Sequence, residues 1–245
     1  MTRSALVTGA SKGIGLGIAT RLASQGYGLT ITARDAERLA VVAEELTRAG
    51  SPDVVVSAGD MADENFASAL VATHGDRFGS MRALILNAGV GTSGRVADYP
   101  MRRFDKTVAV NLRTPFALLQ ASLPLLRTAA DADLAGGAKV IALASMAGVY
   151  AESGLAVYGA TKAALISMVE ALNAEESGNG VSATAIAPGY VDTDMSAWTH
   201  DRITPETMIK VDDIVELVDG LLKLSSRAVV PKVVMTRAGT NGYSA

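Results

Sequence analysis

The sequence contains no cysteine, which excludes disulfide bonds and thiol catalysis. Histidine is scarce as well, with only His74 and His200 present. Zinc sites are built mainly from cysteine and histidine, so we predict that the protein has no metal site. We place both histidines on surface or loop segments.

A surplus of basic residues is also missing. The 245 residues include 22 Lys and Arg against 25 Asp and Glu, for a formal net charge of −3. Nucleic acid binding requires a basic footprint and is not expected. No apolar run reaches the roughly 18 residues that span a bilayer, and MTRSALVTGA holds no long apolar signal core. We therefore expect no membrane partner and a cytoplasmic location.

What the sequence does contain is a regular alternation of short apolar runs with stretches rich in Ala, Leu and Glu. Most runs are apolar throughout, which is typical of strands covered on both faces. The alternation predicts an α/β fold, a doubly wound parallel sheet of seven strands with helices on both sides. The expected strands are 4–8, 28–33, 53–59, 82–87, 138–145, 181–187 and 231–236. No linker or repeat interrupts the pattern, so we expect a single domain over residues 1–245.

In an open parallel sheet, ligands bind outside the carboxyl ends of the strands. The first strand is followed by TGASKGIG, residues 8–15. Gly9, Gly13 and Gly15 permit a tight turn, and the helix that begins there points free N–H groups at an anion. The order of strand, glycine turn and helix favours dinucleotide binding over a purely structural turn.

The turn after the second strand bears on which dinucleotide is bound. Folds that prefer NAD place an acid near the end of this strand for the ribose 2′-hydroxyl. Here Ala33 and Arg34 occupy that region, and Asp35 comes one residue later. Arg34 can form a forked pair with a 2′-phosphate, and Lys12 can reach the same group. Each could be an ordinary surface cation, but together they favour NADP.

The other strand ends also carry small or polar residues. These are Gly59, Asp60 and Met61 after the third strand, Asn87, Ala88 and Gly89 after the fourth, Ser145 after the fifth, and Pro188 and Gly189 after the sixth. Asp60 could accept a hydrogen bond from the adenine amino group or could cap the next helix. We expect these strand ends to face one crevice.

Just beyond Ser145, the apolar segment AVYGATKAAL (156–165) holds Tyr158 and Lys162, four residues apart. On a helix, positions i and i+4 lie on one face. Alone, the pair could be a solvated stripe or a reaction centre.

These segments, taken in order, resemble the classical short-chain dehydrogenase/reductase family over nearly the whole chain. The motifs are TGASKGIG (8–15), NAG (87–89), Asn111 in AVNLRTPF, Ser145 thirteen residues before Tyr158, YGATK (158–162) and PGYVDT (188–193). Any one of them is weak, whereas the complete set in this order is highly specific. The resemblance implies a Rossmann-type sheet and catalysis by Asn111, Ser145, Tyr158 and Lys162.

For the cofactor, the resemblance implies NADP(H). Asp60 would touch the adenine, Asn87 the adenosine ribose and Thr193 the nicotinamide amide. The full set of expected cofactor-binding residues is Gly9, Ser11, Lys12, Gly13, Ile14, Gly15, Arg34, Asp60, Met61, Asn87, Ala88, Gly89, Tyr158, Lys162, Pro188, Gly189, Val191 and Thr193.

These residue types suit hydride transfer between NADPH and a ketone or secondary alcohol. Reduction places negative charge on the carbonyl oxygen, and a proton must reach it. A free tyrosine, with a pKa of about 10, shuttles protons poorly near pH 7, and the ammonium of Lys162 would lower that pKa. Ser145 can donate a hydrogen bond to the carbonyl oxygen. A water chain from Asn111 to Lys162 is implied by the resemblance alone.

Two helical segments contain more apolar residues than a helix with a single buried face would need. In YGATKAALISMVEALNAE and RTPFALLQASLPLL, apolar residues cover most of the circumference. One face would cover the sheet and another a partner subunit, so we expect a homo-oligomer, either a tetramer or a dimer.

The substrate is expected to be a small carbonyl compound or alcohol. The expected pocket residues are Val90, Gly91, Met146, Tyr150, Glu152, Leu155, Tyr190, Met195 and Trp198. Most are apolar and none is a cation, which favours a neutral ketone over a free carboxylate. Glu152 would disfavour an anion nearby, or it could be solvated.

Three other functions compete with this one. An NAD-preferring alcohol dehydrogenase of the same family would use Asp35 at the ribose. A sugar-nucleotide epimerase or dehydratase needs a longer chain after Pro188. A dinucleotide-sensing regulator would be expected to lack part of the catalytic set, and all four residues are present.

Overall fold

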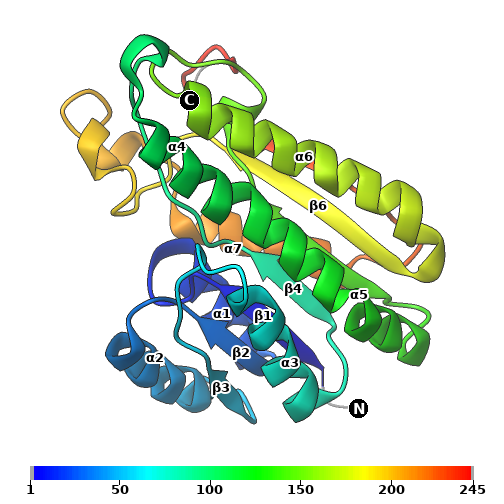
Figure 1. Ribbon diagram of the computed structural model, residues 1–245. Coiled ribbons are helices and arrows are strands. Elements are labelled where there is room, and N and C mark those ends of the chain that lie inside the picture. Colours follow the sequence, from blue (N-terminus) through cyan, green and yellow to red (C-terminus); the bar gives the residue numbers. More distant parts are fainter. Residues whose placement is uncertain (1–2, 244–245) are drawn as a thin grey trace.

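The computed structural model describes residues 3–243 and contains one parallel sheet with helices on both faces (Figure 1). The strand order is β3-β2-β1-β4-β5-β6-β7, and every neighbouring pair is parallel. The strands are β1 Ser4–Thr8, β2 Gly28–Thr32, β3 Val54–Val56, β4 Ala83–Leu86, β5 Ala138–Leu143, β6 Val181–Pro188 and β7 Lys232–Met235. The predicted Rossmann-type fold is confirmed. Residues 1–2 and 244–245 of the expected domain lie outside the described residues.

The expected strand 53–59 differs most from the structure, because only Val54–Val56 form β3. This strand lies at the edge of the sheet and pairs with β2 alone. Beyond it, the amides of Ser57 and Gly59 still donate to the carbonyls of Ile31 and Ala33, at 3.0 Å each. The chain thus stays beside β2 while leaving regular strand geometry to enter the turn with Asp60.

The helices are α1 Gly13–Ser24, α2 Ala36–Arg48, α3 Phe66–Phe78, α4 Met101–Val108, α5 Thr114–Ala132, α6 Ala156–Glu176 and α7 Val211–Lys223. One hydrophobic cluster joins the sheet to α1, α2 and α7, and a second joins it to α3, α5 and α6. In Figure 1, α5 and α6 lie in front of the sheet and α7 behind it. The five inner strands are therefore buried on both faces, as their apolar runs predict, whereas the edge strands β3 and β7 are only partly buried.

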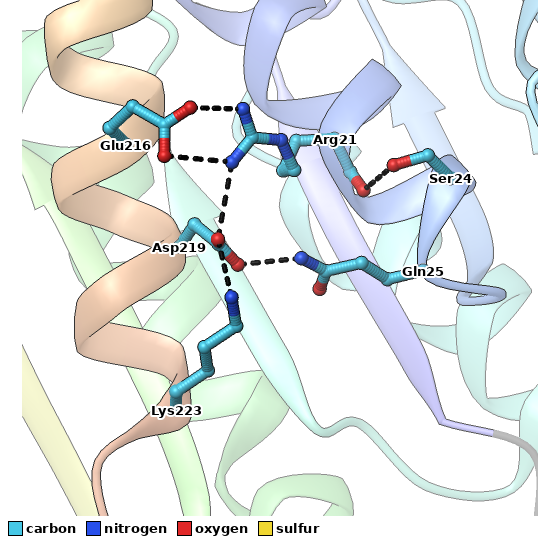
Figure 2. A network of polar contacts seen from close by, with 6 residues as sticks. All are labelled: Arg21, Ser24, Gln25, Glu216, Asp219 and Lys223. Atoms are coloured by element: carbon cyan, nitrogen blue, oxygen red, sulfur yellow. Dashed lines mark hydrogen bonds and ion pairs between the residues drawn. The ribbon is translucent and has the colours of Figure 1, made fainter.

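A polar network fixes α7 against α1 (Figure 2). Arg21 of α1 pairs with Glu216 and, at 3.1 Å, with Asp219. Asp219 also accepts hydrogen bonds from Gln25 at 2.6 Å and Lys223 at 2.7 Å. Burial opposes ionisation of Asp219, but its hydrogen bonds and the nearby cations outweigh burial and hold its pKa below the usual value. The network thereby fixes α7, the helix that follows the loop after β6. That loop forms one wall of the crevice described below.

His74 is a core residue, so its expected position on the surface is wrong. The side chain is fully buried on α3 between β1 and β2. Its ring nitrogens contact Thr30 Oγ1 at 2.8 Å, the carbonyl of Ser80 at 3.1 Å and Ser4 Oγ at 3.2 Å. Burial lowers the pKa of His74 to about 4. His200 follows a short 3₁₀ turn in a loop, as expected.

Acidification should destabilise the fold through His74. The unfolded chain takes up a proton on this ring from about pH 6.5, whereas the folded state keeps it neutral down to about pH 4. The unfolded state thus binds more protons in this window, and the free energy of unfolding falls by roughly 3 kcal/mol as the pH drops through it. Urea unfolding at pH 7 and 4.5 should show a smaller acid-induced loss for His74→Gln than for wild type. His200→Gln is the control. Equal losses in His74→Gln and wild type would contradict this role.

Candidate active site

A cavity of about 1210 Å³ lies at the carboxyl ends of β1 to β6. Successive strands are added on one side of β1 up to β3 and then on the other side from β4 to β7, so the strand order reverses between β1 and β4. The cavity lies at this switch point, where such folds bind ligands. Every expected cofactor-binding residue lines it except Gly15. Of the expected catalytic residues, Ser145, Tyr158 and Lys162 line the cavity and Asn111 does not.

The glycine turn after β1 has the backbone that its residues predict. Gly9 and Gly13 have φ angles of +67° and +56°, a conformation that favours glycine. Gly15 has a packing role instead. A Cβ atom there would lie 2.2 Å from the carbonyl oxygen of Gly9 and 2.4 Å from Nδ2 of Asn87. Gly15 therefore lets α1 approach the turn closely without facing the cavity.

The first turn of α1 is free to receive an anion. The N-cap residue Lys12 makes no side-chain capping bond, and the first turn holds no acidic residue. By contrast, α2 is capped by Asp35, whose Oδ1 accepts from the amide of Arg38 at 2.9 Å. Uncapped N–H groups at a helix start, in a glycine turn that lines a cavity, fit the pyrophosphate of a dinucleotide.

Thr8 ties the first and fourth strand ends together. Its hydroxyl donates to the carbonyl of Ile85 at 3.1 Å and accepts from the amides of Asn87 and Ala88 at 2.9 Å. Asn87 in turn donates to the carbonyls of Thr8 and Gly9. This role of Thr8 was not predicted from the sequence, although a polar residue at the end of a buried strand can indicate a contact between strand ends.

Four charged residues surround the corner where an adenosine ribose would lie. Arg34 is exposed and has no ion-pair partner within residues 3–243. Arg38 donates to the carbonyl of Ser11 at 3.3 Å and so links α2 to the glycine turn. Lys12 forms an ion pair with Asp194 at 2.7 Å. Neither Arg38 nor Asp194 was foreseen, because their partners are distant in sequence.

Asp60 does not cap the next helix. Its Oδ1 accepts from the amide of Ala62 at 2.9 Å and stabilises a local turn. The helix α3 begins only at Phe66. The cap alternative is therefore wrong, and contact with adenine stays a prediction.

Tyr158 and Lys162 are neighbours on α6, where Lys162 is buried and Tyr158 is half-buried at the cavity wall. Lys162 Nζ lies 5.7 Å from the centre of the Tyr158 ring and donates to the carbonyl of Leu143 at 2.6 Å. Burial lowers the pKa of Lys162 to about 8. Burial raises the pKa of Tyr158, and a hydrogen bond with Ser145 partly opposes it. The expected net lowering of the Tyr158 pKa by Lys162 is thus wrong for the protein alone, since burial dominates.

Asn111 acts as a clamp between segments. It lies in a π-helical turn, Ala109–Arg113, between α4 and α5. Its Oδ1 accepts from the amide of Val90 at 2.8 Å, and its Nδ2 donates to the carbonyl of Val90 and to Thr161 Oγ1. Single π turns inside helices are frequent at functional sites. Asn111 thus joins the loop after β4 to the residue that precedes Lys162.

Most of the expected pocket residues line the same cavity. They are Val90, Gly91, Glu152, Leu155, Tyr190, Met195 and Trp198. Met146 is buried and does not line the cavity, and Tyr150 packs edge-on against Tyr243 instead. Glu152 is tied down, because Tyr190 donates its hydroxyl to Glu152 Oε1 at 2.9 Å. Burial and this carboxylate raise the pKa of Tyr190 to about 12.

Besides Arg38, two further cations in the cavity wall were not predicted from the sequence. Arg103 and Lys106 of α4 line it as well, so the cavity holds cations besides the expected pocket residues, and the preference for a neutral ketone stays a prediction. The two residues share a helical face with Thr107, whose hydroxyl lies 3.3 Å from that of Thr92 in the loop after β4. Reading the strand ends alone could not find them, since α4 follows a long loop.

The comparisons with known proteins agree with this geometry. Residues 3–203 match the family described as short chain dehydrogenase. The chain belongs to this family. It is 36% identical over 195 residues to an uncharacterised oxidoreductase of Staphylococcus epidermidis, and the match covers 80% of each chain.

Two solved structures share the fold of this chain, each at a TM-score of 0.86 and 27% identity. One is an alcohol dehydrogenase from Thermococcus sibiricus complexed with 5-hydroxy-NADP, with 98% of this chain and 97% of the other covered. The second is a 3-oxoacyl-[acyl-carrier protein] reductase from Brucella melitensis in complex with NAD, with 96% and 95% covered.

As a member of the short-chain dehydrogenase family, the protein is an oxidoreductase that acts on an alcohol or ketone with a nicotinamide dinucleotide. No helix within residues 3–243 is long and apolar enough to cross a membrane. The same residues contain no cluster of His, Cys, Asp or Glu that could hold a metal ion.

Proposed function

We propose that this short-chain dehydrogenase uses NADP(H) and that Tyr158 is its catalytic acid and base. The observation that supports the cofactor preference is that the neighbouring charged residues Asp35 and Arg34 differ in their contacts. Asp35 is engaged as the cap of α2, while Arg34 is exposed and unpaired among the described residues. An acid bound to its own helix is poorly placed for a ribose 2′-hydroxyl, whereas a free guanidinium suits a 2′-phosphate.

Different residues around the cavity would bind different parts of the cofactor. The uncapped start of α1 would hold the pyrophosphate, and Arg34 with Lys12 the 2′-phosphate. Asp60 would touch the adenine and Thr193 the nicotinamide amide. Of the two similar structures, one is complexed with 5-hydroxy-NADP and the other with NAD, so we argue the preference of this chain from its own residues. The bound cofactor supplies or accepts the hydride.

The side chains on α6 and after β5 would handle the proton. In the direction of reduction, Tyr158 gives its phenolic proton to the oxygen of the ketone, and the Ser145 hydroxyl donates a hydrogen bond to the same oxygen. The ammonium of Lys162 stabilises the resulting phenolate, because burial of this cation limits its screening by water. Asn111 keeps α6 in register through Thr161.

We also propose that the protein is a homo-oligomer. Helices α4 and α5 expose Met101, Phe104 and Phe116, of which Phe116 is 53% exposed. Exposed aromatic side chains on adjacent helices support a subunit interface. The outer face of α6 carries mainly alanines, which permit close approach of a second helix.

The cofactor preference is tested by kcat/KM for NADPH and NADH with a reactive diketone. Wild type should favour NADPH at least about tenfold. Arg34→Ala should lower the NADPH value roughly 10- to 150-fold, since a charge-assisted hydrogen bond is worth about 1.5–3 kcal/mol. The NADH value should change little. Arg48→Ala, at the far end of α2, the helix that follows Arg34, is the matched control.

Preference for NADH in wild type, or equal harm to both cofactors in Arg34→Ala, would refute Arg34 as the phosphate ligand. Asp35 would then be the residue to test. Absence of turnover with either cofactor across ketones and secondary alcohols would count against hydride transfer itself.

A further inference from the structure

We propose that Asp194 helps to set cofactor specificity, by holding Lys12 in an ion pair from which the 2′-phosphate of NADP(H) displaces it. This inference rests on the proposed use of NADP(H) and adds a residue to it. Lys12 is then not simply a phosphate ligand but a cation with two competing partners.

The ion pair joins two segments that face each other across the crevice. Lys12 lies in the turn between β1 and α1, and Asp194 lies in the loop after β6. Their charged atoms are 2.7 Å apart, and both residues line the cavity. The side chains are 70% and 77% exposed, so the pair lies at the mouth of the cavity, where a ligand can reach it.

The loop holds Asp194 at this place by other contacts. Thr193 lies over the glycine turn, because a Cβ atom at Gly13 would be 3.5 Å from its Cγ2. Met195 reaches the opposite wall in the same way, with its Cγ 3.2 Å from a Cβ placed at Gly91. Ser196 closes the turn through hydrogen bonds with Thr193 and Val191. These contacts of its neighbours hold the backbone at Asp194 beside the glycine turn that carries Lys12.

Electrostatics favours exchange of partners when the ligand carries a phosphate. Water screens an exposed pair such as this one, which makes it weak. A 2′-phosphate brings close to two negative charges, and the unpaired Arg34 also faces it. Lys12 would leave Asp194 for the phosphate, but the lost pair and the nearby carboxylate lower the net affinity. NAD(H) has no such phosphate, so Lys12 stays paired in its complex.

An alternative role would give the opposite result. If the ion pair were a latch that retains any dinucleotide, its removal would weaken NADPH and NADH binding alike. If Asp194 competes with the phosphate, its neutralisation strengthens NADPH binding and leaves NADH binding unchanged. The sign of the effect on NADPH therefore separates the two roles.

The test is the dissociation constant of NADPH and of NADH for wild type and Asp194→Asn, measured by calorimetry at low and high salt. We expect Asp194→Asn to bind NADPH about two- to fivefold more tightly, the range that an exposed ion pair is worth. NADH affinity should not change, and high salt should remove the gain. In a Lys12→Met background, Asp194→Asn should have no effect.

Asp192→Asn is the matched control, because Asp192 is exposed and lines the same cavity but does not pair with Lys12. Weaker NADPH binding by Asp194→Asn, an equal gain for NADH, or an equal gain in Asp192→Asn would overturn the proposal. Wild type that binds NADH more tightly than NADPH would refute the proposed preference. The effect of Asp194→Asn on NADPH affinity tests the exchange in either case.

Discussion

Tyr158→Phe should lower kcat by roughly 100- to 10,000-fold, the usual contribution of a general acid or base. The substitution removes the one hydroxyl on α6 that lines the cavity beside Ser145 and Lys162. The phenyl ring still fills the same space, so folding and cofactor binding should remain. The measurements are kcat with NADPH and a diketone, the dissociation constant of NADPH, and the midpoint of thermal unfolding.

Tyr190→Phe is the control, since Tyr190 lines the same cavity but donates its hydroxyl to Glu152. That variant should keep most of its kcat. A Tyr158→Phe protein with more than about a tenth of wild-type kcat would move the acid role to another residue.

Lys162→Met should inactivate the enzyme and stabilise its fold. Lys162 is 5% exposed, and its only hydrogen bond among the described residues goes to the carbonyl of Leu143. Burial lowers its pKa from 10.5 to about 8, so below pH 8 the folded state carries an ammonium at a cost of roughly 3 kcal/mol. Methionine fills the space without this cost. The free energy of unfolding at pH 7 should rise by up to that amount, while kcat/KM falls about 100-fold or more.

The pH dependence of the wild type follows from the same pKa. The unfolded chain binds one more proton than the folded state between about pH 8 and 10.5, so stability should rise with pH through this window. The ammonium is lost from the free enzyme above about pH 8, and kcat/KM for reduction should fall there. Lys162→Met should show neither change.

Lys139→Met is the control for burial of a cation. Lys139 is buried at the opposite end of β5, where it donates to Ser182 and to the carbonyl of Ser225. Its replacement should alter stability and leave kcat/KM in place. A Lys162→Met protein that is active, or less stable than wild type at pH 7, would contradict the role assigned to the buried ammonium.

The sheet could be read from the sequence because each strand is coded locally. A run such as SALVT at residues 4–8 is apolar on both faces, and that pattern alone predicts a strand covered by helices on two sides. The glycine turn and the Tyr158–Lys162 pair are local too, since positive φ angles and the spacing of a helical turn depend on neighbouring residues.

The partners of polar side chains could not be read in this way. His74 is in the core because Thr30 and Ser4 receive its ring, 44 and 70 residues away. Asp35 became a helix cap and Asp60 a turn residue, although both are acids after a strand. The spacing of residues along a chain specifies which face a side chain occupies, but not which distant segment packs against it.

The same limit applies to the crevice. Lys12 and Asp194 are 182 residues apart, and no local pattern links them. Their contact exists because parallel pairing brings the ends of β1 and β6 to one edge of the sheet. Arg103 reaches the cavity from a helix that follows a loop, so its place depends on how α4 packs. Sequence periodicity therefore predicts the scaffold, the family resemblance implies the reacting residues, and tertiary packing determines which charges face the cavity.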